Sequence, residues 1–139
     1  MSTFIHITNS PLDAAAVIAL VKSDTAGAVN VFVGTVRNIT KNKPVIKLEF
    51  EAYEAMALKE MNKIAQQVKE RWPINAMAIH HRLGDLSIGD IPVVIAVSTP
   101  HRQQSFEACQ FAIDELKKTV PIWKKEFFSD GSQWVSAHP

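Results

Sequence analysis

Four lysines lie within nine residues near the C-terminal end of the chain, on either side of an apolar Val-Pro-Ile-Trp segment. Pro121 cannot continue a helix and pushes Val120 out of the α region, so a helix should end at about Thr119 and an extended segment should follow. This places Lys117 in a last helical turn and Lys124 on a strand beside it. Two ammonium groups there could converge on an anion or an acyl group. Alternatively, Lys117 only complements the C-terminal end of the helix dipole.

A second group of possible anion ligands lies at His101 and Arg102, in the first turn of the predicted helix. Positive charge there opposes the helix dipole, so it is mildly unfavourable unless an anion binds. A guanidinium, an imidazole and free backbone N–H groups would together form a phosphate or carboxylate site. An ion pair between Arg102 and a nearby surface acid is the alternative. Arg37 is a further candidate because it follows a predicted strand where that strand should emerge.

The composition is typical of one soluble domain covering residues 1–139, with 47% hydrophobic and 21% charged residues. No stretch approaches the ~20 apolar residues of a membrane span, and the N-terminus lacks a signal-peptide layout, so we expect a cytoplasmic protein. A net charge of +1 argues against a nucleic-acid binder. The single cysteine, Cys109, excludes an internal disulfide and a cysteine-cluster metal site. We therefore predict no metal.

Hydrophobic patterns predict five main strands, at residues 4–8, 28–36, 45–53, 75–83 and 91–98. The second is a β-branched run typical of a strand buried on both faces, and Gly34 within it indicates a bulge or a close backbone approach. The third should place Ile46, Leu48 and Phe50 on one face. The last two flank a turn segment, so they should form a hairpin or lie near one another.

Three helices are predicted, at residues 13–21, at residues 54–72 and from His101 to Thr119. Asn9-Ser10-Pro11 should start the first of them. The inner face of the last helix is predicted to carry Phe106, Cys109, Ile113 and Leu116. Residues 38–44 should form a polar surface loop, and Asp130-Gly131 predicts a hairpin turn. Because strands and helices are mixed rather than strictly alternating, we predict an α+β fold.

Several segments together resemble the large, catalytic subunit of molybdopterin synthase. They are FVGTVR (residues 32–37), LEFEAYEAMA (48–57), HRLGDLSIGD (81–90), the His101-Arg102 pair, LKKTVPIWKKE (116–126) and DGSQWV (130–135). The resemblance implies an α/β-hammerhead fold with a mixed or antiparallel sheet and packed helices. It also implies a central homodimer with a small ubiquitin-like subunit at each end, a heterotetramer overall.

The implied reaction converts cyclic pyranopterin monophosphate to molybdopterin by inserting two sulfurs, with no cofactor. The small subunit would deliver each sulfur as a C-terminal thiocarboxylate. Lys117 and Lys124 would be catalytic, and Arg37, His101 and Arg102 would contact the pterin phosphate. The implied substrate-binding set further includes Thr35, Val36, Lys125 and Glu126. The family's basic cross-subunit residue, which follows the Trp-Val pair, corresponds in position to His138.

The residues also leave a second functional class open, a non-catalytic module that binds a nucleotide or the acidic tail of a partner in the same basic pocket. A sulfurtransferase that used its own persulfide would need an exposed, activated thiol, and Cys109 is predicted to be buried. For the enzyme, sulfur must therefore come from outside the chain.

Overall fold

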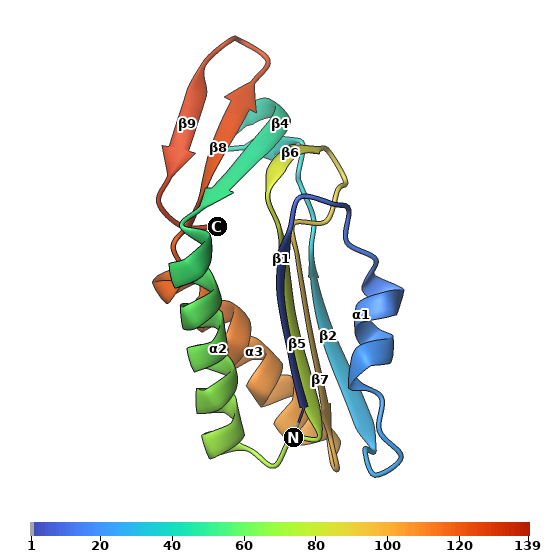
Figure 1. The fold of residues 1–139 in the computed structure, drawn as a ribbon. Coiled ribbons are helices and arrows are strands. Elements are labelled where there is room, and N and C mark those ends of the chain that lie inside the picture. Colours follow the sequence, from blue (N-terminus) through green and yellow to red (C-terminus); the bar gives the residue numbers. More distant parts are fainter. Residues whose placement is uncertain (1) are drawn as a thin grey trace.

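The computed structural model describes residues 2–139 as nine strands and three helices (Figure 1). The strands are β1 Ser2–Thr8, β2 Ala28–Gly34, β3 Ile39–Thr40, β4 Lys43–Ala52, β5 Ala76–Arg82, β6 Gly84–Ser87, β7 Val93–Thr99, β8 Ile122–Phe128 and β9 Gln133–Ser136. The helices are α1 Ala14–Val21, α2 Glu54–Arg71 and α3 Arg102–Thr119. The predicted α+β class is confirmed.

A four-stranded sheet with the order β1-β5-β7-β2 forms the long part of the molecule. Only the β1–β5 pair is parallel, and β7 pairs antiparallel with both β5 and β2. Helices α2 and α3 cover one face of this sheet and the short helix α1 covers the other (Figure 1). The predicted pairing of residues 75–83 with residues 91–98 is thus confirmed.

The central strand β7 shows how the sequence builds two hydrophobic layers. Val93, Ile95 and Val97 contribute to the core beneath α2 and α3, whereas Val94 and Ala96 contribute to the smaller core beneath α1. Successive side chains of a strand point to opposite faces, so a continuous apolar run fits a strand that is covered on both sides.

A second sheet, which we call the head, lies at one end of the first and has the order β3-β4-β8-β9, with β6 also paired to β4 (Figure 1). Strands β8 and β9 form the hairpin predicted at Asp130-Gly131, and Gly131 has a φ of 89°. This head on a longer body matches the predicted hammerhead form.

The strand predicted at residues 28–36 is shorter and more exposed than expected. β2 ends at Gly34 and packs against both hydrophobic layers, through Phe32 on one face and Val31 and Val33 on the other. Because it is an edge strand, it is half-buried rather than fully buried. Its pairing with β7 is regular, without a bulge. A Cβ at Gly34 would lie 2.7 Å from Cγ1 of Val93, so the close-approach interpretation of this glycine is confirmed.

Two predicted inner faces are partly wrong. In β4 the register shifts between Val45 and Lys47, so Val45 is buried and Ile46 is 56% exposed, because a bulge reverses the alternation. In α3, Phe106 is 61% exposed, and the inward positions on that turn belong to Ser105 and Ala108. Cys109 and Leu116 are buried as predicted, and Ile113 is half-buried.

Two local predictions also need correction. Helix α1 begins after Asp13, whose side chain accepts hydrogen bonds from the backbone N–H groups of Ala15 and Ala16, so the proline segment before it lies outside the helix. Residues 38–44 form the β3–β4 hairpin instead of a plain loop, with Lys41 and Asn42 at positive φ in its turn. The predicted turn at residues 84–90 contains strand β6.

Two methionines of α2 allow a matched test of this packing. Met61 is fully buried and Met56 is 57% exposed. Met61→Ala should lower the free energy of unfolding by about 2–5 kcal/mol because it leaves a cavity. Met56→Ala should change it by less than about 0.5 kcal/mol. Urea unfolding of both variants measures the difference, and equal losses would contradict the described orientation of α2.

Candidate active site

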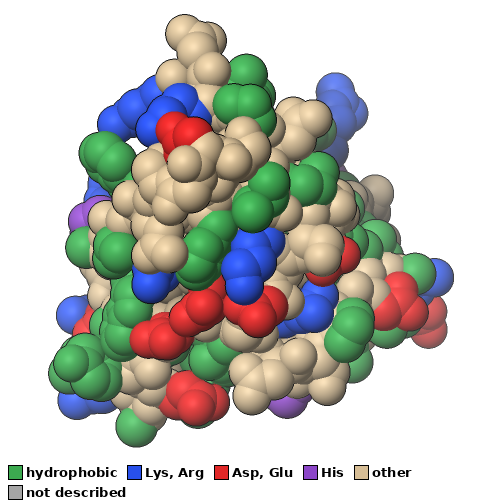
Figure 2. All heavy atoms as spheres, turned by 90° about the horizontal axis from the view of Figure 1, so that it is seen from above, with side chains coloured by type: hydrophobic (Ala, Val, Ile, Leu, Met, Phe, Trp, Pro, Cys, Tyr) green, Lys and Arg blue, Asp and Glu red, His purple; other side chains and the backbone are tan. Residues whose placement is uncertain are grey.

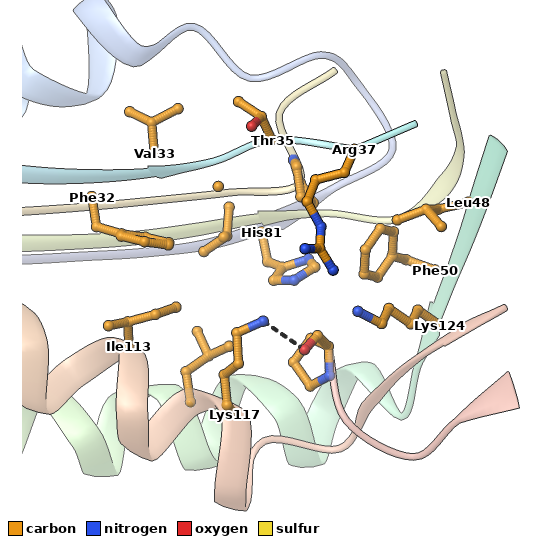
Figure 3. A pocket seen from close by; sticks show the side chains of 15 residues that line it. Phe32, Val33, Thr35, Arg37, Leu48, Phe50, His81, Ile113, Lys117 and Lys124 are labelled. Carbon is orange, nitrogen blue, oxygen red and sulfur yellow. Dashed lines mark hydrogen bonds between the residues drawn. The ribbon is translucent and has the colours of Figure 1, made fainter. Parts of the chain in front are cut away.

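A cavity of about 400 Å³ lies where the long sheet, the end of α3 and the head meet. Three cationic side chains enter it from three different elements: Arg37 after β2, Lys117 from α3 and Lys124 from β8. Figure 3 shows these three side chains pointing toward one another. Phe32, Leu48, Phe50 and Ile113 supply apolar walls. The cavity therefore combines concentrated positive charge with a partly apolar lining.

Lys117 takes its position from the helix end that the sequence predicts. Thr119 is the last residue of α3 and Val120 is already extended, with φ −81° and ψ 125°. Lys117 Nζ donates a 2.7 Å hydrogen bond to the carbonyl oxygen of Pro139. Although Lys117 remains solvent-exposed as a residue, burial of its ammonium group and then repulsion by Lys124 lower its pKa below the ordinary lysine value. It is therefore easier to deprotonate than a surface lysine.

Successive side chains of strand β8 point to opposite faces of the head sheet, so Lys124 and Glu126 share one face and Lys125 lies on the other. Lys124 faces the cavity, and its Nζ lies 3.8 Å from Oε1 of Glu126, which is 5% exposed. The other oxygen of Glu126, Oε2, is buried and has no hydrogen-bond partner among the described residues. Lys125 points to the opposite side, beside Glu49 and Trp123. Glu126 therefore lies behind Lys124, and Lys125 lies outside the cavity.

The segment after β2 is fixed to the turn that precedes β7. The Val36 N–H donates to the carbonyl of Asp90, and the Gly89 N–H donates to the carbonyl of Val36. Val36 is buried in the core, while its neighbours Thr35 and Arg37 are exposed and line the cavity. The backbone of Val36 thus positions Arg37, and its side chain does not reach the cavity.

His81 lines the cavity and was not among the predicted site residues. It is 1% exposed, its Nδ1 lies 2.8 Å from the carbonyl oxygen of Arg82, and its ring packs edge-on against Phe50. Burial lowers its pKa to about 4, with a further lowering by Lys117 opposed by the Arg82 carbonyl. The available signal was the His80-His81 pair at the end of a buried strand, since one of two adjacent strand residues must face inward.

The structure does not bring His101 and Arg102 to this cavity. Arg102 begins α3 and Lys117 lies in its last turn, so about 22 Å of helix separates them at a rise of about 1.5 Å per residue. β2 and β7 run antiparallel, which places Arg37 and His101 at opposite ends of the sheet. Both His101 and Arg102 are exposed. Within one chain, the two groups of predicted phosphate ligands are therefore separate.

The remaining predicted residues lie around or away from the cavity. His138 is exposed in the segment after β9 and does not line the cavity, although Pro139 beside it does. Cys109 is buried, and burial raises the pKa of its thiol to about 11. This confirms that it is a core residue and not an activated thiol. Across residues 2–139, no cluster of three or more His, Cys, Asp or Glu side chains suited to a metal was found.

The head carries charges of both signs. Lys43 pairs with Asp130 at 3.0 Å, and Lys47 lies 3.7 Å from Asp85. Figure 2, which views the molecule from above the head, shows lysine and arginine side chains interspersed with acidic ones. In the part of the chain that the structure describes, no helix is long and apolar enough to span a membrane.

Comparison with known proteins gives a consistent result. The model of the MoaE protein family matches residues 7–119. The chain belongs to the MoaE family. It is 50% identical over 135 residues to molybdopterin synthase catalytic subunit 1 of Aedes aegypti, covering 94% of this chain and 87% of that protein.

Solved structures agree with this assignment. Molybdopterin synthase from Staphylococcus aureus superposes with a TM-score of 0.89 at 40% identity, covering 95% of this chain and 96% of that one. A complex of subunits 1 and 2 of the molybdopterin-converting factor from Helicobacter pylori matches with a TM-score of 0.78 at 25% identity, covering 97% and 93%. The chain thus has the function of a molybdopterin synthase catalytic subunit, a sulfur-transferring enzyme of molybdenum cofactor biosynthesis. Family membership favours this class over a non-catalytic module.

The electrostatic coupling between the two cavity lysines of this MoaE chain can be tested directly. Lys124→Gln removes a positive charge near Lys117, so the pKa of Lys117 should rise toward its ordinary value, while burial keeps it lowered. NMR titration of the lysine ε-carbons measures this shift. Lys125→Gln is the control, because Lys125 lies on the other face of β8, and it should leave the pKa of Lys117 unchanged. If the pKa of Lys117 does not rise in Lys124→Gln, burial alone lowers that pKa.

Proposed function

We propose that the cavity binds cyclic pyranopterin monophosphate together with the C-terminal tail of a small ubiquitin-like subunit, and that it inserts two sulfurs to form molybdopterin. The tail would carry each sulfur as a glycine thiocarboxylate. The observation that carries this proposal is the convergence of Arg37, Lys117 and Lys124 on one cavity. Both ligands are anionic, and an anion relieves the repulsion among these cations.

Lys117 is the proposed residue closest to the chemistry. A lysine with a lowered pKa can present a neutral amine, which can attack a carbonyl carbon. In the proposed role its Nζ polarises or captures the glycyl carbonyl as sulfur leaves. Lys124 would stabilise negative charge on the carbonyl oxygen or the departing sulfur. Because Cys109 is buried with a raised pKa, it supports an external sulfur source.

The contact between Lys117 and Pro139 supports access for an extended peptide. Pro139 is buried in the cavity, and its carbonyl oxygen accepts the hydrogen bond from Lys117 Nζ at 2.7 Å. Main chain can therefore reach Lys117 with a backbone oxygen directed at its amine. The glycyl carbonyl of a partner tail would make the same contact, after displacing residue 139.

The head offers a docking surface for the small subunit. β9 is an edge strand of the head sheet, and its Trp134 and Val135 side chains are 49% and 63% exposed. A free edge next to exposed apolar side chains suits strand pairing with a partner. The Helicobacter pylori relative was solved as a complex of two subunits, which supports a small partner for this chain.

The second group of ligands, His101 and Arg102, would serve the cavity of a second copy. β2 is one of the two edge strands of the long sheet, and Ala28 pairs with Thr99 at its start. If two β2 strands pair antiparallel about a two-fold axis, the end of one β2 lies beside the start of the other. Arg37 of one copy would then approach His101 and Arg102 of the second copy. The proposed homodimer would complete two phosphate sites in this way.

Lys117→Ala tests the proposed chemistry. It should lower single-turnover dithiolene formation by roughly a hundredfold or more, the scale of losing one positioned catalytic group. Stability should change by about 1 kcal/mol, because a helix-end charge and one partly buried hydrogen bond to Pro139 are removed. Lys118→Ala is the matched control, since Lys118 is exposed and does not line the cavity. Equal rates for wild type and both variants would remove Lys117 from the mechanism.

Mixed dimers test whether sites are shared between copies. Lys117→Ala and Arg102→Ala chains should each be impaired alone. Unfolded together and refolded at equal amounts, half of the dimers carry one intact site if Lys117 and Arg102 come from different copies, which restores about a quarter of wild-type activity. Mixing should restore nothing if both residues act within one chain. Light scattering should show about twice the monomer mass for each sample.

A further inference from the structure

His81 is a buried titratable side chain in the cavity that the roles of the lysines and arginines leave without a function. It lies at the end of β5, where its backbone pairs with Ile7 of β1 on one side and Val93 of β7 on the other. Phe50 of β4 packs edge-on against its ring at 5.3 Å between centroids. These contacts on several sides hold the imidazole in one place, at the wall of the cavity.

The hydrogen bond to Arg82 defines which nitrogen carries the proton. A carbonyl oxygen can only accept, so the 2.8 Å contact requires Nδ1 of His81 to be the donor. In the neutral ring, Nε2 then has a free lone pair. Figure 3 shows the ring directed into the cavity between Arg37 and Lys117. The wall therefore presents a hydrogen-bond acceptor to the space that the substrates would occupy.

The charged groups around this acceptor are all cationic. Lys117 faces it from α3, Lys124 from β8 and Arg37 from the segment after β2, while β4 contributes only the apolar side chains of Leu48 and Phe50. Glu126 is held behind Lys124 and does not line the cavity. Protonated lysines and arginine have no lone pair to offer. Apart from a neutral Lys117 amine, whose lone pair serves as the nucleophile, His81 is the nitrogen-bearing side chain that offers a free lone pair among those lining the cavity in the described chain.

We propose that Nε2 of His81 is the proton acceptor for Lys117 in the sulfur-transfer step. This role rests on the proposed function, in which Lys117 captures the glycyl carbonyl. The thiocarboxylate sulfur first bonds to a carbon of the pterin substrate and displaces an oxygen of its cyclic phosphate ester. The amine lone pair of Lys117 then forms a bond to the glycyl carbonyl carbon, and the bond between that carbon and sulfur breaks. Its electron pair stays on the sulfur, which remains on the pterin as a thiolate, and the glycyl group is left as an amide on Lys117. The nitrogen becomes positively charged as it bonds, and its proton passes to Nε2 and from there to water. No oxidant or reductant is needed.

The electrostatics of the cavity fit an acceptor whose base strength rises when substrate binds. In the unoccupied site, burial and Lys117 hold the pKa of His81 at about 4, so the ring is neutral at pH 7 and its lone pair is available. A bound phosphate and a thiocarboxylate add negative charge, which raises the pKa of a nearby imidazole. Base strength at Nε2 would thus increase when both substrates are present.

The variant His81→Asn distinguishes a role as proton acceptor from a role in packing. Its side-chain N–H₂ can still donate to the Arg82 carbonyl, where Nδ1 of the histidine lies, but it places no base at the position of Nε2. His81→Asn should lower single-turnover sulfur transfer by roughly a hundredfold, the scale of losing a general base. The difference in rate between His81→Asn and wild type should decrease as pH rises, because hydroxide replaces the missing proton acceptor. Small-subunit binding should stay unchanged. His80→Asn is the control, since His80 lies on the opposite face of β5, and it should match wild type.

Chemical rescue provides the readout that a structural role would not move. His81→Ala opens space beside the cavity, and added imidazole should restore part of its sulfur transfer in proportion to the free-base fraction. Transfer at the wild-type rate by His81→Asn would overturn the proposal. The proposal would also be overturned if His81→Asn is slower than wild type by the same factor at every pH and added imidazole does not increase the rate of His81→Ala. A wild-type chain without sulfur transfer would instead overturn the proposed function, and this role with it.

Discussion

Repulsion between cations that the fold forces together is the constraint on which the site depends. Lys117 and Lys124 come from a helix end and a strand that are joined by a few residues, and both side chains enter one cavity. Leu116 and Ile122 are fully buried on either side of the helix end at Pro121, so the backbone that carries the two lysines cannot shift without disturbing the core. The free energy of this arrangement improves when an anion enters.

The two sheets and α3 together bring these cations to one cavity. The long sheet supplies Arg37 and His81, α3 supplies Lys117 and the head supplies Lys124. Partial enclosure by apolar walls lowers the local polarity, which strengthens attraction to anions and favours a neutral lysine amine. Oε1 of Glu126 lies 3.8 Å from Nζ of Lys124 and attracts its ammonium group, while Oε2 of Glu126 has no hydrogen-bond partner among the described residues. In the proposed function, anion binding and activation of Lys117 would thus have one electrostatic origin.

The length of α3 limits which residues of one chain can contact the same ligand. The two ends of an 18-residue helix lie too far apart to contact one ligand, so His101 and Arg102 cannot reach a ligand bound beside Lys117 of the same chain. In the proposed homodimer, a second copy would pair along the edge strand β2 and bring its own His101 and Arg102 toward this cavity. In this view the helix acts as a spacer between two sites of a dimer.

Local chemistry in the sequence was enough to predict some of this. Pro121 defines the end of α3 and thereby places Lys117 beside Lys124, and the Asp130-Gly131 turn defines the last hairpin. Tertiary structure determined the rest. The bulge that exposes Ile46, the edge position of β2 and the inward turn of His81 depend on partners distant in sequence. Spacing along a chain predicts which side chains share a face of one element, but only packing between elements determines what that face meets.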